Sequence, residues 1–369
     1  MKTIIKTCGV TGKKIYNILK ADYHSYNCEF LDNSPNKWGI EVEGAKVHSI
    51  YEVGNMYSNG EVDKIVVPDK FFQHKEIEIL KSIGILEQDI LVFNQEMYEK
   101  GEYPLINLDE FNALPYLEFH INDHCNLNCK GCSHFCPLVN EEKFTDYNQF
   151  EKDIQRLKEL IQYIKIIRIM GGEPLLNKEL DKFINITRKM YPFSDIRVVT
   201  NGILLPSLSD DIWNCMKEND VGFDISAYPA VYNNINSYVK IIQEHSVKLN
   251  GILHVSSFTP ILHTKREVPF DNTRNCTCYN LHEGMISSCP MTFYGKYFNK
   301  YFEKNIPFES GNIDLYEVGL TGKKLIEKLN QPFELCKYCN QYMFGINDSE
   351  NNTWDIYHKN DKKLEQDWY

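Results

Sequence analysis

Three cysteines lie close together in the sequence HCNLNCKGC, residues 124 to 132. Cys125, Cys129 and Cys132 have the spacing C-x3-C-x2-C and follow an apolar alternation, Tyr116 to Ile121, that predicts a β-strand. Three thiolates on one loop can hold three irons of a cubane cluster and leave the fourth iron open to a substrate or cofactor. Structural zinc is the alternative, but it takes four ligands, usually from paired C-x2-C units. The spacing therefore favours an iron–sulfur cluster with one open iron.

A second motif, Gly171-Gly172-Glu173-Pro174, follows the apolar run Ile166 to Met170. Two glycines at the end of a strand let a small ligand approach the backbone closely. A strand that ends in Gly-Gly is by itself also typical of a plain turn. Because the pair comes one predicted helix after the cysteine loop, the two motifs together indicate a small-molecule site.

The two motifs resemble those of the radical SAM superfamily, in which C-x3-C-x2-C ligates a [4Fe-4S] cluster and GGEP holds the amino group of S-adenosylmethionine. The resemblance implies that Cys125, Cys129 and Cys132 are the cluster ligands. It also implies a set of residues around S-adenosylmethionine, namely Gly171, Gly172, Glu173, Pro174, Thr200, Asn201, Ser226 and Phe135. For Thr200 and Asn201 an ordinary polar turn is the alternative.

The family's adenine-packing position departs from its usual pattern in this chain. The residue before the last cysteine is usually aromatic in the family, but here it is Gly131. Phe135 is therefore the expected apolar wall for adenine. Cys136, four residues past Cys132, is expected to be a small buried residue, because the three-cysteine set is already complete.

The elements that position these motifs alternate between strand and helix. The predicted strands are Leu117–Ile121, Ile166–Met170, Ile196–Thr200, Gly222–Ser226 and Lys248–His254. The predicted helices are Tyr147–Tyr163, Lys178–Met190, Leu208–Glu218 and Ile235–Glu244. This pattern predicts an α/β fold, a partial (β/α)6 TIM-like barrel, whose motifs all fall at the carboxyl ends of its strands. Tyr228, His134, His254 and His282 are candidate proton donors near that mouth, with a structural role as the alternative.

Residues 1–105 predict a separate Rossmann-like domain. Strands are expected at Thr3–Val10, Tyr26–Leu31, Lys64–Pro68 and Asp89–Phe93, and helices at Gly12–Lys20 and Phe71–Ile83. The first turn, Thr7 to Gly12, keeps two of the three glycines of G-x-G-x-x-G, and Asp32 lies where a ribose-binding acid would be. A nucleotide or nucleotide-sugar site and a module for recognition or packing remain equal alternatives.

The run FLDNSPNKWG, Phe30 to Gly39, is similar to Rossmann-like modules in proteins of sugar and surface-polysaccharide biosynthesis. This resemblance favours a saccharide substrate. Residues 106–114 are expected to be a linker to the barrel, which is assigned to residues 106–265.

The C-terminal part, residues 266–369, contains five further cysteines. Gly284-x4-Cys289 followed by Cys336-x2-Cys339 resembles the twitch form of the SPASM extension, which holds one auxiliary [4Fe-4S] cluster with four cysteines. Cys276 and Cys278 compete for the remaining ligand place, and the spacing to Gly284 slightly favours Cys276. A tetrahedral zinc site from the same thiolates is the alternative.

The net charge and the composition of the chain limit the classes of molecule that it is expected to bind. Lys+Arg 40 against Asp+Glu 51 gives a net charge of −11, which opposes binding to nucleic acid or an anionic membrane. The opening residues MKTIIKTCGV have no secretory h-region, which predicts a soluble, cytoplasmic protein. Without a secretory signal, the clustered cysteines favour metal binding over disulfides.

The resemblance implies an enzyme that reductively cleaves S-adenosylmethionine to a 5′-deoxyadenosyl radical, with an electron donor such as flavodoxin or ferredoxin. The predicted reaction is hydrogen abstraction from a small polar substrate, a saccharide or nucleotide-linked sugar, in net oxidation or epimerisation. Two alternatives remain open. One is a ribosomal peptide maturase of the SPASM or twitch type, and the other is a non-catalytic iron–sulfur or zinc scaffold.

Overall fold

The chain forms two compact units, Met1–Ala113 and Leu114–Tyr369. The computed structural model describes residues 1–69, 74–264, 276–340 and 352–369. The predicted first boundary at residue 105 falls too early, because β7 (Leu105–Asn107) pairs with β6 (Ile90–Phe93) of the first unit. Residues 106–113 are therefore part of that unit and not a linker. The predicted boundary at 265 lies outside the described residues.

The first unit is built on a seven-stranded sheet of order β3-β4-β2-β1-β5-β6-β7. Its other strands are β1 (Lys2–Lys6), β2 (Asn27–Leu31), β3 (Glu41–Val42), β4 (Ala45–His48) and β5 (Lys64–Pro68). Its helices are α1 (Val10–Asp22), α2 (Ile50–Ser58), α3 (His74–Ser82) and α4 (Gln95–Glu99). The five central strands are parallel, in the order 3-2-1-4-5 of a Rossmann fold. The first residues of the predicted helix Phe71–Ile83 lie outside the described residues.

The turn after β1 explains why that strand ends earlier than predicted. Thr7 has a φ of +78°, a left-handed conformation, in the place of the first glycine of the dinucleotide-binding fingerprint. Gly12 has no room for a side chain, since a Cβ there would lie 1.9 Å from the Thr7 carbonyl oxygen. Helix α1 therefore begins at Val10 and packs closely on the turn.

The Asp32 side chain, at the end of β2, is hydrogen-bonded to residues of this turn and its surroundings. Its carboxylate accepts hydrogen bonds from the Cys8 and Ser34 backbone N–H groups and from the Lys37 ammonium. Burial opposes ionisation, but these donors outweigh it and hold the pKa of Asp32 well below its usual range. A neighbouring pocket of about 140 Å³ is lined by Lys6, Thr7, Asp32, Asn33 and Glu76. Because protein donors already occupy Asp32, its position favours a packing role over ribose binding.

The second unit is built on an eight-stranded sheet of order β12-β11-β10-β9-β8-β14-β15-β16. Its strands are β8 (Ala113–His120), β9 (Tyr163–Met170), β10 (Asp195–Thr200), β11 (Gly222–Ala227), β12 (Lys248–His254), β14 (Asn280–His282), β15 (Met285–Ser287) and β16 (Ile313–Asp314), with β13 (Ser257–Phe258) and β17 (Asn352–Thr353) paired separately. Strands β9 to β12 are parallel to one another. This arrangement confirms an α/β fold consistent with a partial TIM-like barrel.

The sixth parallel strand does not follow β12 at the end of the sheet. It is β14, which pairs with β8 at the opposite side, Asn280 against Glu118 and Leu281 against Phe119. Strands β15 and β16 extend the sheet from β14 in antiparallel fashion. The predicted C-terminal domain therefore shares its sheet with the barrel.

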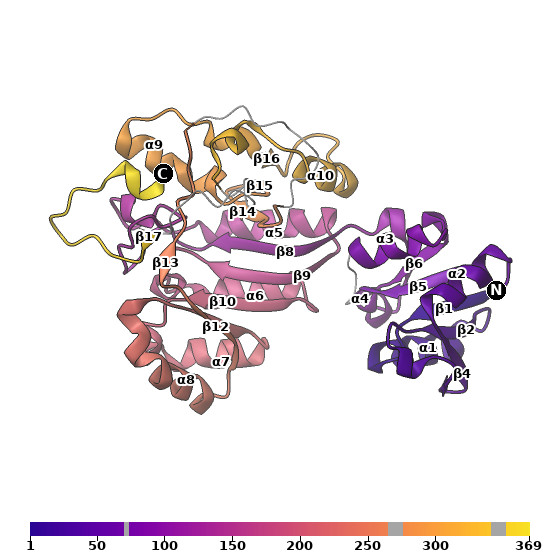
Figure 1. Ribbon diagram of the computed structural model, residues 1–369. Coiled ribbons are helices and arrows are strands. Elements are labelled where there is room, and N and C mark those ends of the chain that lie inside the picture. The colour runs from indigo at the N-terminus through magenta and orange to yellow at the C-terminus, as the bar shows by residue number, and fades with distance from the viewer. Residues whose placement is uncertain (70–73, 265–275, 341–351) are drawn as a thin grey trace. The chain divides into compact units, whose positions relative to one another are not determined.

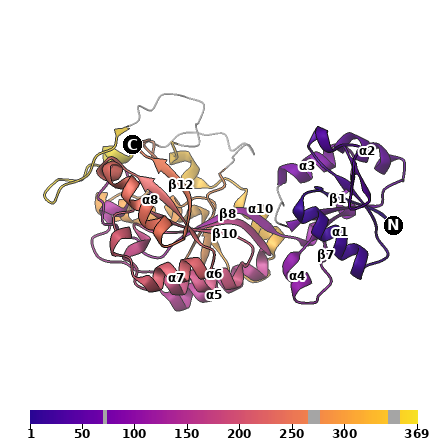
Figure 2. The same cartoon turned by 90° about the horizontal axis from the view of Figure 1, so that it is seen from below.

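The helices of the second unit are α5 (Tyr147–Leu160), α6 (Leu180–Met190), α7 (Asp210–Glu218), α8 (Ile235–Glu244), α9 (Met291–Phe302) and α10 (Gly322–Leu329). Helices α5, α6 and α7 lie side by side over one face of the sheet (Figure 2). They bury aliphatic and aromatic side chains such as Ile154, Phe183 and Trp213 against the strands. In the described part of the chain, no helix has both the length and the apolar composition to cross a membrane.

Candidate functional site

The cysteine loop leaves the carboxyl end of β8, as the sequence predicts. Cys129 is buried, whereas Cys125 and Cys132 are partly exposed. Burial raises the pKa of Cys125 and that of Cys129, the latter to about 12, and the nearby Cys132 thiolate adds to both effects. A hydrogen bond from the Cys136 thiol lowers the pKa of Cys132. The three thiols are thus close enough to act on one another electrostatically.

The Gly-Gly pair after β9 packs directly against this loop. A Cβ on Gly171 would lie 2.6 Å from the Asn122 carbonyl oxygen, and one on Gly172 would lie 2.1 Å from that of His124. The Gly172 N–H donates to the Asn122 carbonyl (2.8 Å), and the Glu173 N–H donates to that of His124 (3.2 Å). Only glycine fits where these two backbones meet.

Glu173 joins the loop after β9 to the loop after β10. Its Oε1 accepts from the Thr200 hydroxyl (2.7 Å) and the Leu175 N–H (3.2 Å), and its Oε2 accepts from the Asn201 N–H (2.9 Å). The side chain is buried, and burial raises the pKa of Glu173 to about 7 even though these donors favour the ionised form. Pro174, at the start of the following 3-10 turn, is also buried.

Asn201 extends the network to the cysteine loop. Its Nδ2 donates to the Asn126 side chain (2.7 Å) and lies 3.9 Å from the sulfur of Cys125. Ser226 and Tyr228 reach the same rim from the end of β11, and both are partly buried. Burial, followed by the charges of the nearby cysteines, raises the pKa of Tyr228. The four loops after β8, β9, β10 and β11 therefore meet at one place.

This arrangement fits a cluster held by three thiolates. The donor set is chemically suitable for iron, and each thiolate binds a different iron, so the sulfurs need not converge on one point. The Gly-Gly backbone and the Glu173 network lie directly beside the sulfurs. No three His, Cys, Asp or Glu side chains converge as a site for a single metal ion within the described residues.

Phe135 does not suit the adenine role that the sequence suggested. Its side chain is fully buried and packs against Phe298, Phe308 and Trp368, so no face of the ring remains for a ligand. Its position close to the cysteines in sequence gave no signal that it belongs to a hydrophobic core. Cys136 is buried, as expected.

Gly131, where the family usually has an aromatic residue, is covered by the chain itself. Its φ is +70°, and a Cβ there would lie 2.6 Å from the Asp367 carbonyl oxygen. Aromatic rings beside the cysteines come instead from Tyr228 and Trp354, which stack with centroids 5.9 Å apart. Sequence reasoning missed Trp354, because no local pattern links it to the cysteine loop.

The cysteines assigned to an auxiliary cluster fall into two groups. Cys289 and Cys339 pack against the same aromatic core, and Cys336 lies one short turn before Cys339, whose N–H donates to the Cys336 carbonyl (3.3 Å). Cys276 and Cys278 are separated by Thr277 alone, and Cys278 is the more exposed of the two.

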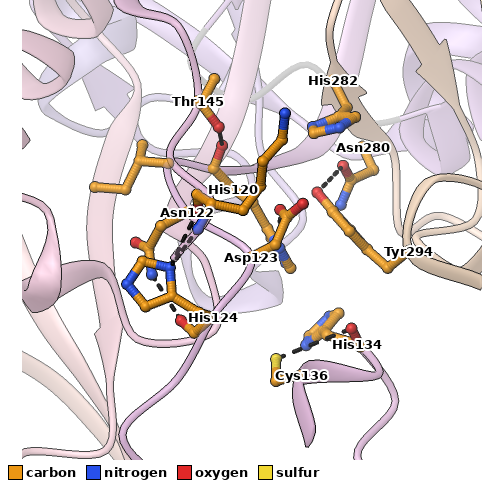
Figure 3. A network of polar contacts seen from close by, with 12 residues as sticks. His120, Asn122, Asp123, His124, His134, Cys136, Thr145, Asn280, His282 and Tyr294 are labelled. Atoms are coloured by element: carbon orange, nitrogen blue, oxygen red, sulfur yellow. Dashed lines mark hydrogen bonds and ion pairs between the residues drawn. The ribbon is translucent and has the colours of Figure 1, made fainter. Parts of the chain in front are cut away.

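A buried polar cluster lies beside the cysteine loop (Figure 3). The His120 ring stacks on that of Tyr294 at 3.8 Å, and its Nδ1 lies 3.9 Å from the Asp123 carboxylate, beyond hydrogen-bond distance. Within the described residues, neither ring nitrogen of His120 or of His282 has a hydrogen-bond partner. Burial lowers the pKa of His120 to about 3, so the ring is neutral at physiological pH. A cavity of about 10 Å³ beside both rings has about the volume that one water needs.

The radical SAM superfamily model matches residues 120–248. This range begins at the end of β8 and contains the cysteine loop, the GGEP segment and the loops after β10 and β11. Residues 120–248 of the chain therefore match a radical SAM domain. The cofactors of this family are a [4Fe-4S] cluster and S-adenosylmethionine, and the loops of this radical SAM domain meet where both would be held.

The curated relatives match part of this chain. A GTP 3′,8-cyclase of Clostridium acetobutylicum is 32% identical over 145 residues, which cover 37% of this chain and 44% of the relative. A GTP 3′,8-cyclase of Heliobacterium modesticaldum is 33% identical over 99 residues, which cover 26% of this chain and 30% of the relative. The chain thus spans less than half the length of either protein.

Solved structures of radical SAM proteins are also similar, at low identity. BtrN in complex with AdoMet and 2-DOIA is 16% identical with a TM-score of 0.39, covering 62% of this chain and 93% of that chain. The structure of anSMEcpe with bound AdoMet is 19% identical with a TM-score of 0.33, covering 39% of this chain and 44% of that chain.

Proposed function

We propose that this chain reductively cleaves S-adenosylmethionine and abstracts hydrogen from a small polar substrate, a saccharide or nucleotide-linked sugar, in net oxidation or epimerisation. The observation that carries the proposal is the direct packing of the Gly171-Gly172 backbone on a loop of three mutually interacting cysteines. When bound, the cluster and S-adenosylmethionine supply a 5′-deoxyadenosyl radical that takes hydrogen from an unactivated C–H bond.

The chain's own residues would bind and orient these groups. Cys125, Cys129 and Cys132 would ligate the cluster, and the buried Glu173 would be the acidic group nearest to the methionyl amine. A cationic amine beside this carboxyl would favour its ionised form and offset the effect of burial. Thr200 and Asn201 hold the Glu173 carboxylate in place, and Ser226 on the next strand would line the ribose side.

The C-terminal cysteines would hold one auxiliary [4Fe-4S] cluster. The proposal is supported by Cys289 and Cys339, which pack against one aromatic core, and by Cys336, which lies one short turn before Cys339, with Cys276 or Cys278 as the fourth ligand. Four thiolates leave no open iron, so such a cluster would transfer electrons and would not bind substrate.

A purine nucleotide is the second candidate substrate. The matching relatives are GTP 3′,8-cyclases, which favours GTP, although the match covers only 37% of this chain or less. Cyclisation of a nucleotide would make the enzyme a lyase or cyclase and not an oxidoreductase or epimerase.

The test is a comparison of substrates. The anaerobically reconstituted full chain receives dithionite, S-adenosylmethionine and, separately, UDP-glucose, UDP-N-acetylglucosamine, an aminocyclitol, GTP or a synthetic peptide. We expect 5′-deoxyadenosine to rise several-fold above background with a sugar, and deuterium from a ring-deuterated sugar to appear in it. A rise with GTP or with peptide alone would overturn the saccharide assignment.

A further inference from the structure

A segment near the C-terminus runs along the cysteine loop. The Lys130 N–H donates to the Asp355 carbonyl (2.9 Å), and the Tyr357 N–H donates to the Asn128 carbonyl (2.8 Å). Between them Cys129 and Ile356 form an antiparallel bridge. Residues 355–357 are therefore held by backbone hydrogen bonds and an isolated antiparallel bridge against the loop that contains the middle cysteine.

Trp354, the residue before this segment, contacts a cysteine sulfur directly. Its indole Nε1 lies 3.3 Å from the sulfur of Cys129, within the hydrogen-bond range for sulfur. An indole nitrogen only donates, so the sulfur accepts. The backbone N–H of Trp354 donates to the Ser256 carbonyl (2.9 Å), and its ring stacks on Tyr228. Trp354 is thus held through its backbone, through its indole N–H and through the stack of its ring on Tyr228.

The contacts between the C-terminal residues and the cysteine loop continue to Cys132, the third cysteine. The Trp368 indole donates to the Cys132 carbonyl (2.9 Å), and the Asp367 backbone passes over Gly131, which has no side chain to obstruct it. The Lys130 ammonium forms an ion pair with the Asp355 carboxylate. The two ends of the yellow C-terminal trace therefore contact the loop, and the part between them extends outward (Figure 1).

We propose that Trp354 is a positioning residue that donates a hydrogen bond to the Cys129 thiolate and thereby raises the reduction potential of the cluster. The proposal rests on the proposed function, since it takes Cys129 as a cluster ligand. Reduction adds negative charge to the cluster, and a donor to a ligand sulfur stabilises the more negative state. Without the indole N–H, the cluster should be harder to reduce.

The test is the Trp354→Phe variant of the reconstituted full chain, which keeps an aromatic ring but loses the donor. The readouts are iron content and the midpoint potential of the electron paramagnetic resonance signal that responds to S-adenosylmethionine. We expect unchanged iron content and a shift of the midpoint potential to more negative values. Trp38→Phe is the matched control, because it removes an indole donor to the Asp32 carbonyl in the other unit, and it should leave the potential unchanged.

A second substitution separates the hydrogen bond from ring packing. Benzothienylalanine at position 354 keeps the shape of tryptophan and replaces the N–H by sulfur, so it should reproduce the shift even if Trp354→Phe perturbs folding. An unchanged potential in this protein would overturn the inference while leaving the proposed function intact. A wild-type chain that binds iron but shows no response to S-adenosylmethionine would overturn the proposed function, and the inference with it.

Discussion

Gly172 is where the backbone of the GGEP segment comes closest to the cysteine loop. The three nearest atoms to a Cβ at this position are all backbone atoms, the His124 carbonyl oxygen at 2.1 Å, the His124 carbonyl carbon at 2.3 Å and the Cys125 nitrogen at 2.8 Å. Backbone cannot rotate away as a flexible side chain can. The glycine pair and the three cysteines therefore belong to one backbone contact. Both motifs have a fixed local spacing, so both could be recognised in the sequence.

We predict that Gly172→Ala displaces the cysteine loop and lowers iron uptake from about eight to about four irons per chain. Overpacking of this kind costs about 1–3 kcal/mol of the free energy of unfolding. Iron analysis after anaerobic reconstitution, with denaturant unfolding of the apoprotein, measures both effects. Gly251→Ala is the control, because its Cβ would meet Asp224 at an ordinary 3.6 Å. Full iron uptake by Gly172→Ala would contradict this reading of the contact.

The sequence revealed the role of Glu173 only in part. The resemblance assigned it to a ligand amine, but the position of its carboxylate between the two loops depends on tertiary contacts. We predict that Glu173→Gln leaves one backbone N–H, of Leu175 or Asn201, facing an amide NH₂ group, which costs about 1–3 kcal/mol. Affinity for S-adenosylmethionine, measured by equilibrium dialysis of the reconstituted protein, should fall at least tenfold. An unchanged affinity would exclude Glu173 from the cofactor site.

At the scale of elements, strand β14 is the feature that the sequence did not reveal. The five strands of the barrel were predicted to within a few residues, because each contains several aliphatic residues and the first four are each followed by a helix. Strand β14 has three residues and pairs with β8, about 160 positions earlier in the chain. No local periodicity encodes such a pairing. The contacts of residues 354–368 with the cysteine loop were not predicted, for the same reason.

Asp153 on α5 anchors the turn between β14 and β15. Its buried carboxylate accepts from the Gly284 N–H (2.7 Å), the Tyr316 hydroxyl (2.8 Å) and the Gln149 amide (2.8 Å). Gly284 has a φ of +79°, so the turn needs both glycine and an external acceptor. This contact joins the C-terminal strands to the barrel helices.

We predict that Asp153→Ala lowers the free energy of unfolding by about 3 kcal/mol, because a buried N–H loses its charged acceptor. Tyr316→Phe removes one donor and leaves the carboxylate its other partners, so it should cost about 1 kcal/mol. Urea unfolding of the two variants beside wild type gives the comparison. Equal effects would mean that the Gly284 contact contributes little.

At the scale of the whole molecule, stability should depend on acid through the buried His120. The folded pKa of about 3 lies below the ordinary value of 6.5, so between these values the unfolded chain binds a proton that the folded chain does not. The contribution of His120 is therefore fully present above pH 6.5 and declines as pH falls toward 3.

We predict that wild type loses about 1 kcal/mol more than His120→Phe between pH 7 and pH 5.5. Phenylalanine keeps the ring that stacks on Tyr294 but has no nitrogen to protonate. Urea unfolding at the two pH values measures the difference, and groups common to both proteins cancel. Parallel losses in the two proteins would show that His120 is hydrated or partnered in solution.

The central claim concerns the three cysteines of the radical SAM domain, and 5′-deoxyadenosine formation tests it most directly. The full chain and a Cys125→Ala, Cys129→Ala, Cys132→Ala variant are reconstituted anaerobically with iron and sulfide, reduced with dithionite and given S-adenosylmethionine. We predict about eight irons per wild-type chain, about four in the variant, and 5′-deoxyadenosine from wild type alone. Iron or zinc bound by wild type without 5′-deoxyadenosine would contradict the claim and indicate a non-catalytic scaffold.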